Sequence, residues 1–325
     1  MKKLLLLLSL LATHSSLLLF AQVQKAPNRA EGDGPHKRLI IRGVTIINST
    51  GSPPIGPMDI VVENNRIAQI RQAGYPGMPN DPKNGVKASL GDKELDCTGM
   101  FIMPGFVDMH GHIGGVQQGA NAEYVFKLWM AHGVTTIRDP SCGNGLDWVL
   151  DQKEKSAKNL ITAPRIKAYT VFGQGAKDFI STPEQARDWV RQNAQKGADG
   201  IKFFGAEPEV FKAALGENKK LGLGSAAHHA QTEVGRMNAL ATARAGLTSM
   251  EHWYGLPEAL FDDKTLQNYP LDYNYNNEQN RFEEAGKLWK QAAKPGTEKW
   301  NQVMDEMLKL DFTIDPTFNI YEASR

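Results

Sequence analysis

The chain has 325 residues, of which 41% are hydrophobic and 22% charged, so it has ample apolar material for a globular core. Lysine and arginine together number 37 and aspartate and glutamate 36, which gives a formal net charge of +1. A near-neutral chain without a basic run offers no electrostatic basis for nucleic-acid binding, and we expect none. Cys97 and Cys142 fit neither a CxxC site nor a disulfide framework; a single bridge between them is the alternative to the two buried free thiols that we expect.

Residues 1–21 have the layout of a secretory signal peptide. Met-Lys-Lys precedes a leucine-rich stretch that ends at Ala21, although Leu19 is not the small residue preferred three positions before the cut. The alternative is an uncleaved membrane anchor, but the His-Ser-Ser run at 14–16 interrupts the ~20 apolar residues that a spanning helix needs. We therefore expect export to the periplasm or the extracellular space, with no stable membrane insertion after cleavage.

The next part of the chain predicts a small β-unit. Residues 22–37 are polar and rich in Gly and Pro, which is typical of a linker. Asn64-Asn65 between two strand patterns indicates a hairpin turn. The strands expected in this unit, residues 38–103, are 39–47, 59–63, 66–70, 94–97 and 101–103.

From residue 104 to 325 strand and helix patterns alternate, which favours a parallel sheet with helical crossovers. No Gly-rich dinucleotide fingerprint follows the first strand, so a barrel is favoured over a Rossmann sheet. The expected strands are 105–109, 134–137, 165–171, 200–204, 223–227, 247–250 and 312–318. The expected helices are 123–132, 146–158, 182–195, 208–221, 233–245, 283–293 and 297–310. Residues 253–280 mix aromatic and polar side chains and fit either a lid over the site or a surface insertion.

Histidines follow three of the predicted strands. His110 and His112 are two residues apart and can face the same side, so both imidazoles can approach one ion at the ~2.0–2.1 Å typical of zinc. Alone, such a pair is more often two surface residues. His229 and His252 follow the fifth and sixth strands, however, and a barrel delivers its strand ends to one face. We predict a metal site there, with His228 as the open alternative to His229.

Lys202 lies inside the predicted strand 200–204, between Ile201 and Phe203. A bare ammonium group is costly to bury among apolar side chains. One interpretation is a lysine at the strand end whose amine reaches water. The other is a modified or ion-paired lysine at the mouth of the barrel.

The run Gly-Met-Phe-Ile-Met-Pro-Gly-Phe-Val-Asp-Met-His-Gly-His at 99–112 resembles the first metal motif of the amidohydrolase superfamily. Gly-Val-Thr-Thr-Ile-Arg-Asp at 133–139, the Lys202 segment and Ala-Gly-Leu-Thr-Ser-Met-Glu-His at 245–252 resemble its imidazolonepropionase-like and prolidase-like branch. The resemblance covers roughly residues 38–320, with the motifs in order.

This resemblance implies an α/β fold in which a small β-sandwich forms around a (β/α)8 TIM barrel. It implies one or two divalent ions, usually zinc: His110 and His112 bind the first, Lys202 as a carbamate bridges the two, and His229 and His252 hold the second. The family's eighth strand ends in an aspartate that acts as general base. Here about seven strands are found and that aspartate has no counterpart, so we expect an incomplete barrel from a C-terminally truncated sequence, and the catalytic base is unassigned.

The expected activity is metal-assisted hydrolysis of a carbon–nitrogen bond in an amide, a cyclic amide or an Xaa-Pro-like peptide. The expected partner is a small-molecule or dipeptide-like substrate, and the oligomeric state is left open. Two alternatives are a catalytically inactive metal-binding fragment of such an enzyme and a secreted structural protein that binds no metal.

Overall fold

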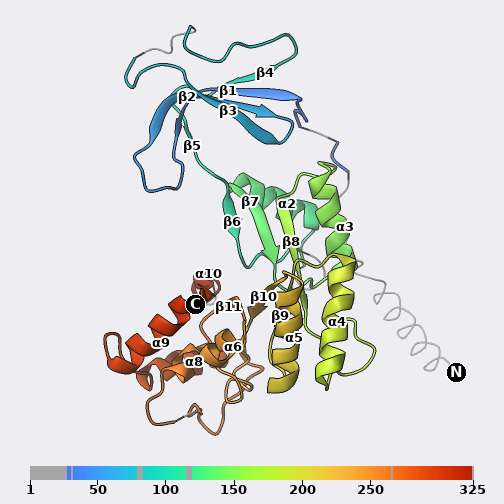
Figure 1. Ribbon diagram of the computed structural model, residues 1–325, viewed down its shortest axis with the longest axis vertical. Helices are drawn as coiled ribbons and strands as arrows, with labels where there is room; N and C mark the ends of the chain where they lie inside the picture. The colour runs from blue at the N-terminus through green and yellow to red at the C-terminus, as the bar shows by residue number, and fades with distance from the viewer. Residues whose placement is uncertain (1–27, 31, 79–82, 115–118, 265, 324–325) are drawn as a thin grey trace, which may run out of the picture. The chain divides into compact units, whose positions relative to one another are not determined.

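The structure is a computed structural model that describes residues 28–30, 32–78, 83–114, 119–264 and 266–323. The predicted signal peptide and residues 22–27 and 31 of the predicted linker lie outside these ranges. The chain divides into two compact units (Figure 1). The smaller unit comprises 28–106 with 133–135, and the larger contains 107–132 and 136–325.

The smaller unit is built on one five-stranded sheet of order β3-β2-β1-β4, with β5 also pairing with β1. Its strands are β1 (Arg38–Ile46), β2 (Ile55–Glu63), β3 (Arg66–Gln72), β4 (Lys93–Asp96) and β5 (Phe101–Ile102). The predicted turn at Asn64-Asn65 is present, because Glu63 pairs with Arg66 and Asn64 adopts a φ of 55°. The described part of this unit contains a single sheet rather than the two facing sheets of a sandwich.

The larger unit is built on a seven-stranded sheet whose strands follow one another in chain order from β6 to β12. The paired strands from β7 to β12 run parallel. Its strands are β6 (Phe106–Asp108), β7 (Val134–Asp139), β8 (Arg165–Val171), β9 (Gly200–Phe203), β10 (Gly224–Ala227), β11 (Ser249–Glu251) and β12 (Thr313–Asp315). Sequential parallel strands with helical crossovers are the arrangement of an incomplete (β/α)8 barrel, so the predicted α/β fold class is confirmed.

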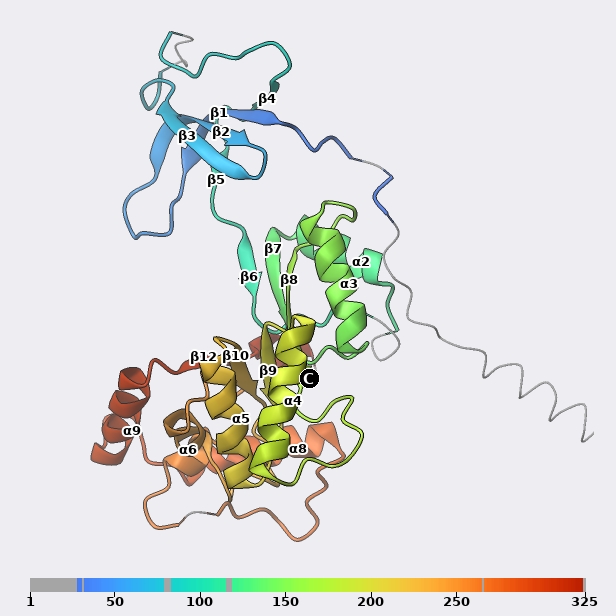
Figure 2. The same cartoon turned by 45° about the vertical axis from the view of Figure 1, so that its right-hand side comes forward.

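Helices connect these strands, and α4 and α5 lie side by side along them (Figure 2). Between the sheet and these two helices a core contains Trp189, Phe203, Phe211 and Leu215, each burial contributing about 1.5–3 kcal/mol. The helical segments are α2 (Ala122–Ala131), α3 (Leu146–Ala157), α4 (Pro183–Lys196), α5 (Pro208–Lys220), α6 (Ala239–Arg244), α7 (Leu256–Ala259), α8 (Glu278–Lys287), the 3-10 helix η3 (Leu288–Lys290), α9 (Glu298–Lys309) and α10 (Phe318–Ala323). No helix in the described ranges is long and apolar enough to cross a membrane.

Two helices begin at residues other than those that the sequence predicted. The helix expected over 233–245 forms only as α6, because the Asn238 side chain accepts a hydrogen bond from the Ala241 amide and caps the helix there. The helix expected from 283 begins at Glu278 as α8, with Asn277 as its cap. Both cysteines are free as expected, but Cys142 is buried whereas Cys97 is only partly so.

Candidate metal centre

The site residues lie at the carboxyl ends of strands in the larger unit. His110 follows β6, Lys202 lies in β9, and His228 directly follows β10. Glu251 and Asp315 are the last residues of β11 and β12. Parallel strands present these ends at one edge of the sheet, so residues up to 205 positions apart (His110 and Asp315) come together.

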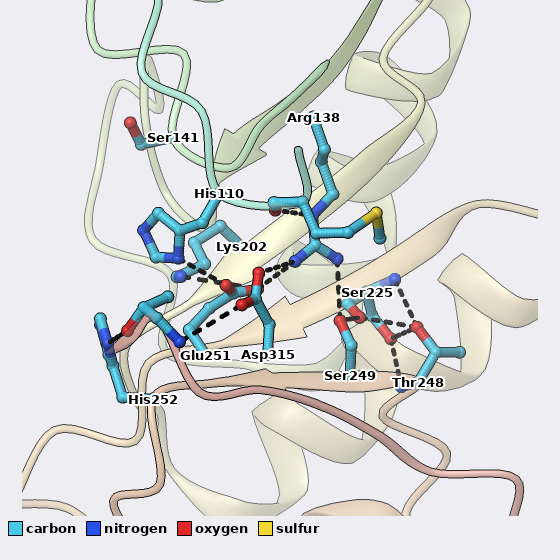
Figure 3. A network of polar contacts seen from close by, with 12 residues as sticks. His110, Arg138, Ser141, Lys202, Ser225, Thr248, Ser249, Glu251, His252 and Asp315 are labelled. Atoms are coloured by element: carbon cyan, nitrogen blue, oxygen red, sulfur yellow. Dashed lines mark hydrogen bonds and ion pairs between the residues drawn. The ribbon is translucent and has the colours of Figure 1, made fainter. Parts of the chain in front are cut away.

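Glu251 is the centre of the arrangement and is fully buried (Figure 3). Its carboxylate lies 2.5 Å from Nδ1 of His110 and accepts a 2.5 Å hydrogen bond from Nη2 of Arg138. Nζ of Lys202 lies 4.0 Å from the same oxygen that Arg138 contacts. Burial alone would raise the pKa of Glu251, but His110, Lys202 and Arg138 together hold it below its ordinary value. The carboxylate is therefore ionised at neutral pH.

His110, Glu251 and Asp315 form a group able to hold a metal ion, because one ligand atom from each lies within 4.8 Å of the others. Asp315 is half-buried, and burial and the neighbouring Glu251 raise its pKa. The two carboxylates were not among the predicted ligands. The sequence signal for Glu251 is an acidic residue that ends an otherwise uncharged strand and directly precedes the predicted ligand His252.

Two more predicted ligands, His112 and His252, lie beside His110. The His110 ring centroid is 5.1 Å from that of His112 and 5.3 Å from that of His252. The His252 backbone has a left-handed φ of 63°, and its Nδ1 lies 2.5 Å from Oγ1 of Thr317, which leaves Nε2 for another partner. Burial, with the nearby charges of His110 and Lys202, lowers the pKa of His252 to about 3, so its imidazole is neutral.

The structure shows which of the neighbouring histidines, His228 or His229, faces the other predicted ligands, a choice that the sequence did not make. The His228 ring lies 4.8 Å from that of His252. His229 turns away: its Nε2 lies 2.8 Å from Oγ1 of Thr242, and its buried Nδ1 has no hydrogen-bond partner. Adjacent residues at a strand end point in opposite directions, so only one of them can face the site. His229, the predicted ligand, is therefore not brought to the other predicted ligands, whereas His228 is.

Lys202 is 2% exposed, so its amine does not reach water as one interpretation had it. Burial lowers the pKa of Lys202 to about 8, although the Glu251 carboxylate opposes this shift. The side chain is thus an ion-paired lysine at the strand end, one of the two alternatives that the sequence offered.

Arg138 was not predicted as a site residue, although it belongs to the Gly-Val-Thr-Thr-Ile-Arg-Asp motif. Its Nε donates to the Met109 carbonyl at 2.6 Å and its Nη1 to Oγ of Ser249 at 2.9 Å. The Ser249 hydroxyl in turn donates to the Ser225 carbonyl, which also accepts from the Thr248 hydroxyl (Figure 3). These contacts fix the guanidinium against Glu251, which in turn fixes the His110 ring.

The donor set fits a divalent ion. Neutral imidazoles and ionised carboxylates are the nitrogen and oxygen ligands that zinc accepts in proteins. A carboxylate that contacts one nitrogen of a histidine also fixes the tautomer and the orientation of its ring, as in many metal sites. Among the described residues, His110 and His252 offer imidazole nitrogens, and Glu251 and Asp315 offer carboxylate oxygens.

No family model matches the chain. Among curated proteins, the chain is 31% identical over 110 residues to adenine deaminase 2 of Desulfotalea psychrophila, covering 30% of this chain and 19% of that protein. It is 34% identical over 101 residues to N-acetylglucosamine-6-phosphate deacetylase of Lysinibacillus sphaericus, covering 31% and 22%. It is 23% identical over 257 residues to dihydropyrimidinase of Rattus norvegicus, covering 72% and 44%. The matches thus span less than half of these relatives.

Solved structures show the same fold. A Xaa-Pro dipeptidase with bound methionine in its active site matches with a TM-score of 0.51 and 19% identity, over 87% of this chain and 67% of that one. An amidohydrolase matches with a TM-score of 0.52 and 17% identity, over 86% and 78%. Together with the curated relatives, these matches place the chain in the amidohydrolase superfamily.

Proposed function

We propose that this chain carries the metal centre of a hydrolase that cleaves a carbon–nitrogen bond with an activated water. The observation that supports it best is the meeting of His110, Glu251, Asp315 and His252 at one edge of the sheet, with Lys202 beside them. The relatives named above are an adenine deaminase, an N-acetylglucosamine-6-phosphate deacetylase and a dihydropyrimidinase, which agrees with a hydrolytic role.

A zinc ion held by these residues would supply a water whose pKa falls toward ~7 and would polarise the scissile carbonyl. The protein's own contribution is positional. Glu251 orients His110. His252 is oriented in the same way by Thr317. His110, Lys202 and Arg138 together keep the fully buried Glu251 carboxylate ionised. We expect one or two ions, with His228 rather than His229 beside His252 and with Lys202 close enough to join them, either as an amine or as a carbamate.

The substrate that we propose is an amide, a cyclic amide or an Xaa-Pro-like dipeptide. The fold-level likeness to a Xaa-Pro dipeptidase and the sequence motifs of the prolidase-like branch favour the dipeptide. The test is zinc-dependent hydrolysis of N-acyl-proline and of a hydantoin by the purified chain, followed as release of proline from the first and as formation of the ring-opened N-carbamoyl amino acid from the second. Turnover that is lost in EDTA and restored by zinc supports the proposal. No turnover of either substrate with zinc present would leave a metal-binding protein without catalysis, which is the second candidate.

We also propose export, with cleavage after Ala21, on the layout of residues 1–21. N-terminal sequencing of the protein recovered from the periplasm or the medium of an expressing bacterium tests this. A mature chain beginning at Gln22 supports it, whereas an intact Met1 in the cytoplasm contradicts it.

A further inference from the structure

The larger unit contains a cavity of about 310 Å³, a size that suits a small molecule. Asp199 and Leu223, which line it, precede β9 and β10, whereas the metal centre lies at the carboxyl ends of the strands. Residues two apart in a strand point to the same side, and Arg138 reaches Ser249 on β11, so this side is the interior of the barrel. Three such pairs line the cavity: Val107 with Met109, Thr136 with Arg138, and Lys167 with Tyr169.

The Tyr169 ring forms one wall of this cavity, and two glycines make room for it. A Cβ atom at Gly200 would lie 2.4 Å from the ring, and a Cβ atom at Gly224 would lie 1.8 Å from the hydroxyl. Val107 and Met109 form another wall and remain 56% and 39% exposed. Closed barrels fill their interior with layers of apolar side chains. Here apolar surface stays open, so it can bury the hydrocarbon part of a ligand.

Two cations face the cavity from neighbouring strands. Arg138 and Lys167 are direct partners in the parallel pairing of β7 with β8, so their side chains point to the same side. Like charges in such positions repel, and each needs an anion to offset it. For Arg138 that anion is Glu251, at 2.5 Å.

Lys167 has only a share of one carboxylate. Its Nζ lies 3.3 Å from Asp199, whose other carboxylate oxygen accepts a 2.6 Å hydrogen bond from Nζ of Lys153. In the described part of the chain, Asp199 is the only acid that lines the cavity. Two ammonium groups therefore face one carboxylate, which leaves one positive charge in excess and favours an anion. The Lys167 side chain is 58% exposed, so it has the space to turn toward such a partner.

We propose that this cavity binds a small amphipathic anion, a carboxylate with an unbranched apolar chain. The carboxylate pairs with Lys167, and the chain lies against Val107 and the Tyr169 ring. The inference goes beyond the proposed hydrolysis, because no bond is made or broken in this cavity. It also explains why a lysine occupies an interior position at which barrels usually place valine, isoleucine or leucine.

Isothermal titration calorimetry of the purified chain with octanoate tests the site. Octanamide is the neutral compound of the same length, and EDTA is present throughout so that no ion at the metal centre can bind the carboxylate. We expect one octanoate per chain, bound about 10-fold more tightly than octanamide, and Lys167→Gln to remove this advantage. The absence of saturable octanoate binding, equal affinities, or an advantage that survives in Lys167→Gln would overturn the proposal.

Further variants guard against a folding defect. Lys212→Gln is the matched control, because Lys212 is a 52% exposed lysine 2.9 Å from a carboxylate on α5, and it should bind both compounds as the unmodified chain does. Val107→Trp places an indole in the cavity from a position that is 56% exposed, so binding of both compounds should be lost from a folded chain. If Lys167→Gln does not fold, Val107→Trp decides: unchanged octanoate binding in this variant contradicts the proposal.

A variant without the two central histidines separates this cavity from the metal centre. The His110→Ala, His252→Ala double variant should bind octanoate as tightly as the unmodified chain, because neither histidine lines the cavity. Loss of octanoate binding in the double variant would place the carboxylate at the metal centre and overturn the proposal. A chain that binds octanoate in this way but hydrolyses neither test substrate would contradict only the proposed hydrolysis.

Discussion

At the scale of single residues, the arrangement of the candidate metal centre depends most on the carboxylate of Glu251. It is one fully buried carboxylate that faces the cations of Arg138 and Lys202 and the ring of His110. A buried ion pair contributes little net stability compared with apolar packing, but removal of one partner leaves the other charge uncompensated. The site is therefore sensitive to any change at this position.

Glu251→Gln keeps the shape of the side chain and removes its charge. We expect a loss of about 3–5 kcal/mol in the free energy of unfolding, because Arg138 and Lys202 would remain buried without their closest carboxylate, and only Asp315, 3.9 Å from Arg138, would be left to offset them. Urea unfolding followed by circular dichroism measures it. The control, Glu283→Gln, removes a 61% exposed carboxylate and should change stability by less than about 0.5 kcal/mol. A loss below about 1 kcal/mol for Glu251→Gln would show that the buried charge does not matter.

The two neighbouring histidines should differ in what they do. His228→Ala removes a ring that faces His252 and should lower the zinc content with little loss of stability. His229→Ala removes a buried ring that contacts Thr242 and should destabilise the fold by about 2–4 kcal/mol while the zinc content is retained. Elemental analysis and thermal unfolding of both variants check this. The reverse pattern would make His229 the ligand.

The histidines of the site could be predicted from the sequence because few residue types bind metal and their positions at strand ends are visible. The roles of Glu251 and Arg138 could not be. Each is a charged residue in a strand, and β8, β9 and β10 lie between their strands in the sheet, so only the curl of the sheet shows that the two charges meet 113 positions apart. The sequence also did not distinguish His228 from His229, because the direction of each ring depends on the local backbone conformation after β10.

At the scale of elements, the sequence predicted the first residue of some helices correctly and missed the start or the existence of others. The start of α4 was predicted at Thr182, and the structure shows a full capping box between Thr182 and Gln185. The start of α6 was not, because residues 231–237 form turns although their apolar pattern resembles a helix. Helix α7, which is four residues long, was missed because it is too short to show a period.

Helix α7 carries a buried acid whose pKa predicts a pH dependence. Glu258 is 3% exposed, and burial raises its pKa to about 7 from an ordinary value of 4.5. Between these two values the folded state holds a proton that the unfolded state has lost. The free energy of unfolding therefore falls as the pH rises through this window, by about 3 kcal/mol in all.

Glu258→Gln should remove this part of the pH dependence and make the protein more stable at pH 8 than the unmodified chain. Urea unfolding at a series of pH values from about 5 to 8 measures it. Glu154→Gln, which changes a 64% exposed carboxylate, should leave the pH profile as it is. An unchanged profile in Glu258→Gln would mean that Glu258 is ionised in the folded protein.

At the scale of the whole molecule, the sheet explains how distant motifs make one centre. Strand order equals chain order from β6 to β12, so Asp315 ends one outermost strand of this sheet and His110 follows the other. That alternation was predictable from the sequence, whereas the closeness of the outermost strand ends was not, because it depends on the curl of the sheet.

An ion bound across β6, β11 and β12 would hold these strand ends together, so it should stabilise the larger unit. Zinc at about 100 times its dissociation constant should add roughly 2.7 kcal/mol to the free energy of unfolding and raise Tm. Calorimetry with and without EDTA measures the shift. If Tm is the same in both, the ion does not bind the folded state in preference to the unfolded one.

Metal stoichiometry is the measurement that tests the centre itself most directly. The chain is purified without chelator, dialysed against zinc and then against buffer, and analysed for zinc per chain beside a His110→Ala, His252→Ala double variant. We expect about one or two ions in the unmodified chain and a clear loss in the double variant. Less than about a tenth of an ion per folded chain, or equal zinc in both proteins, would contradict a metal centre at these strand ends.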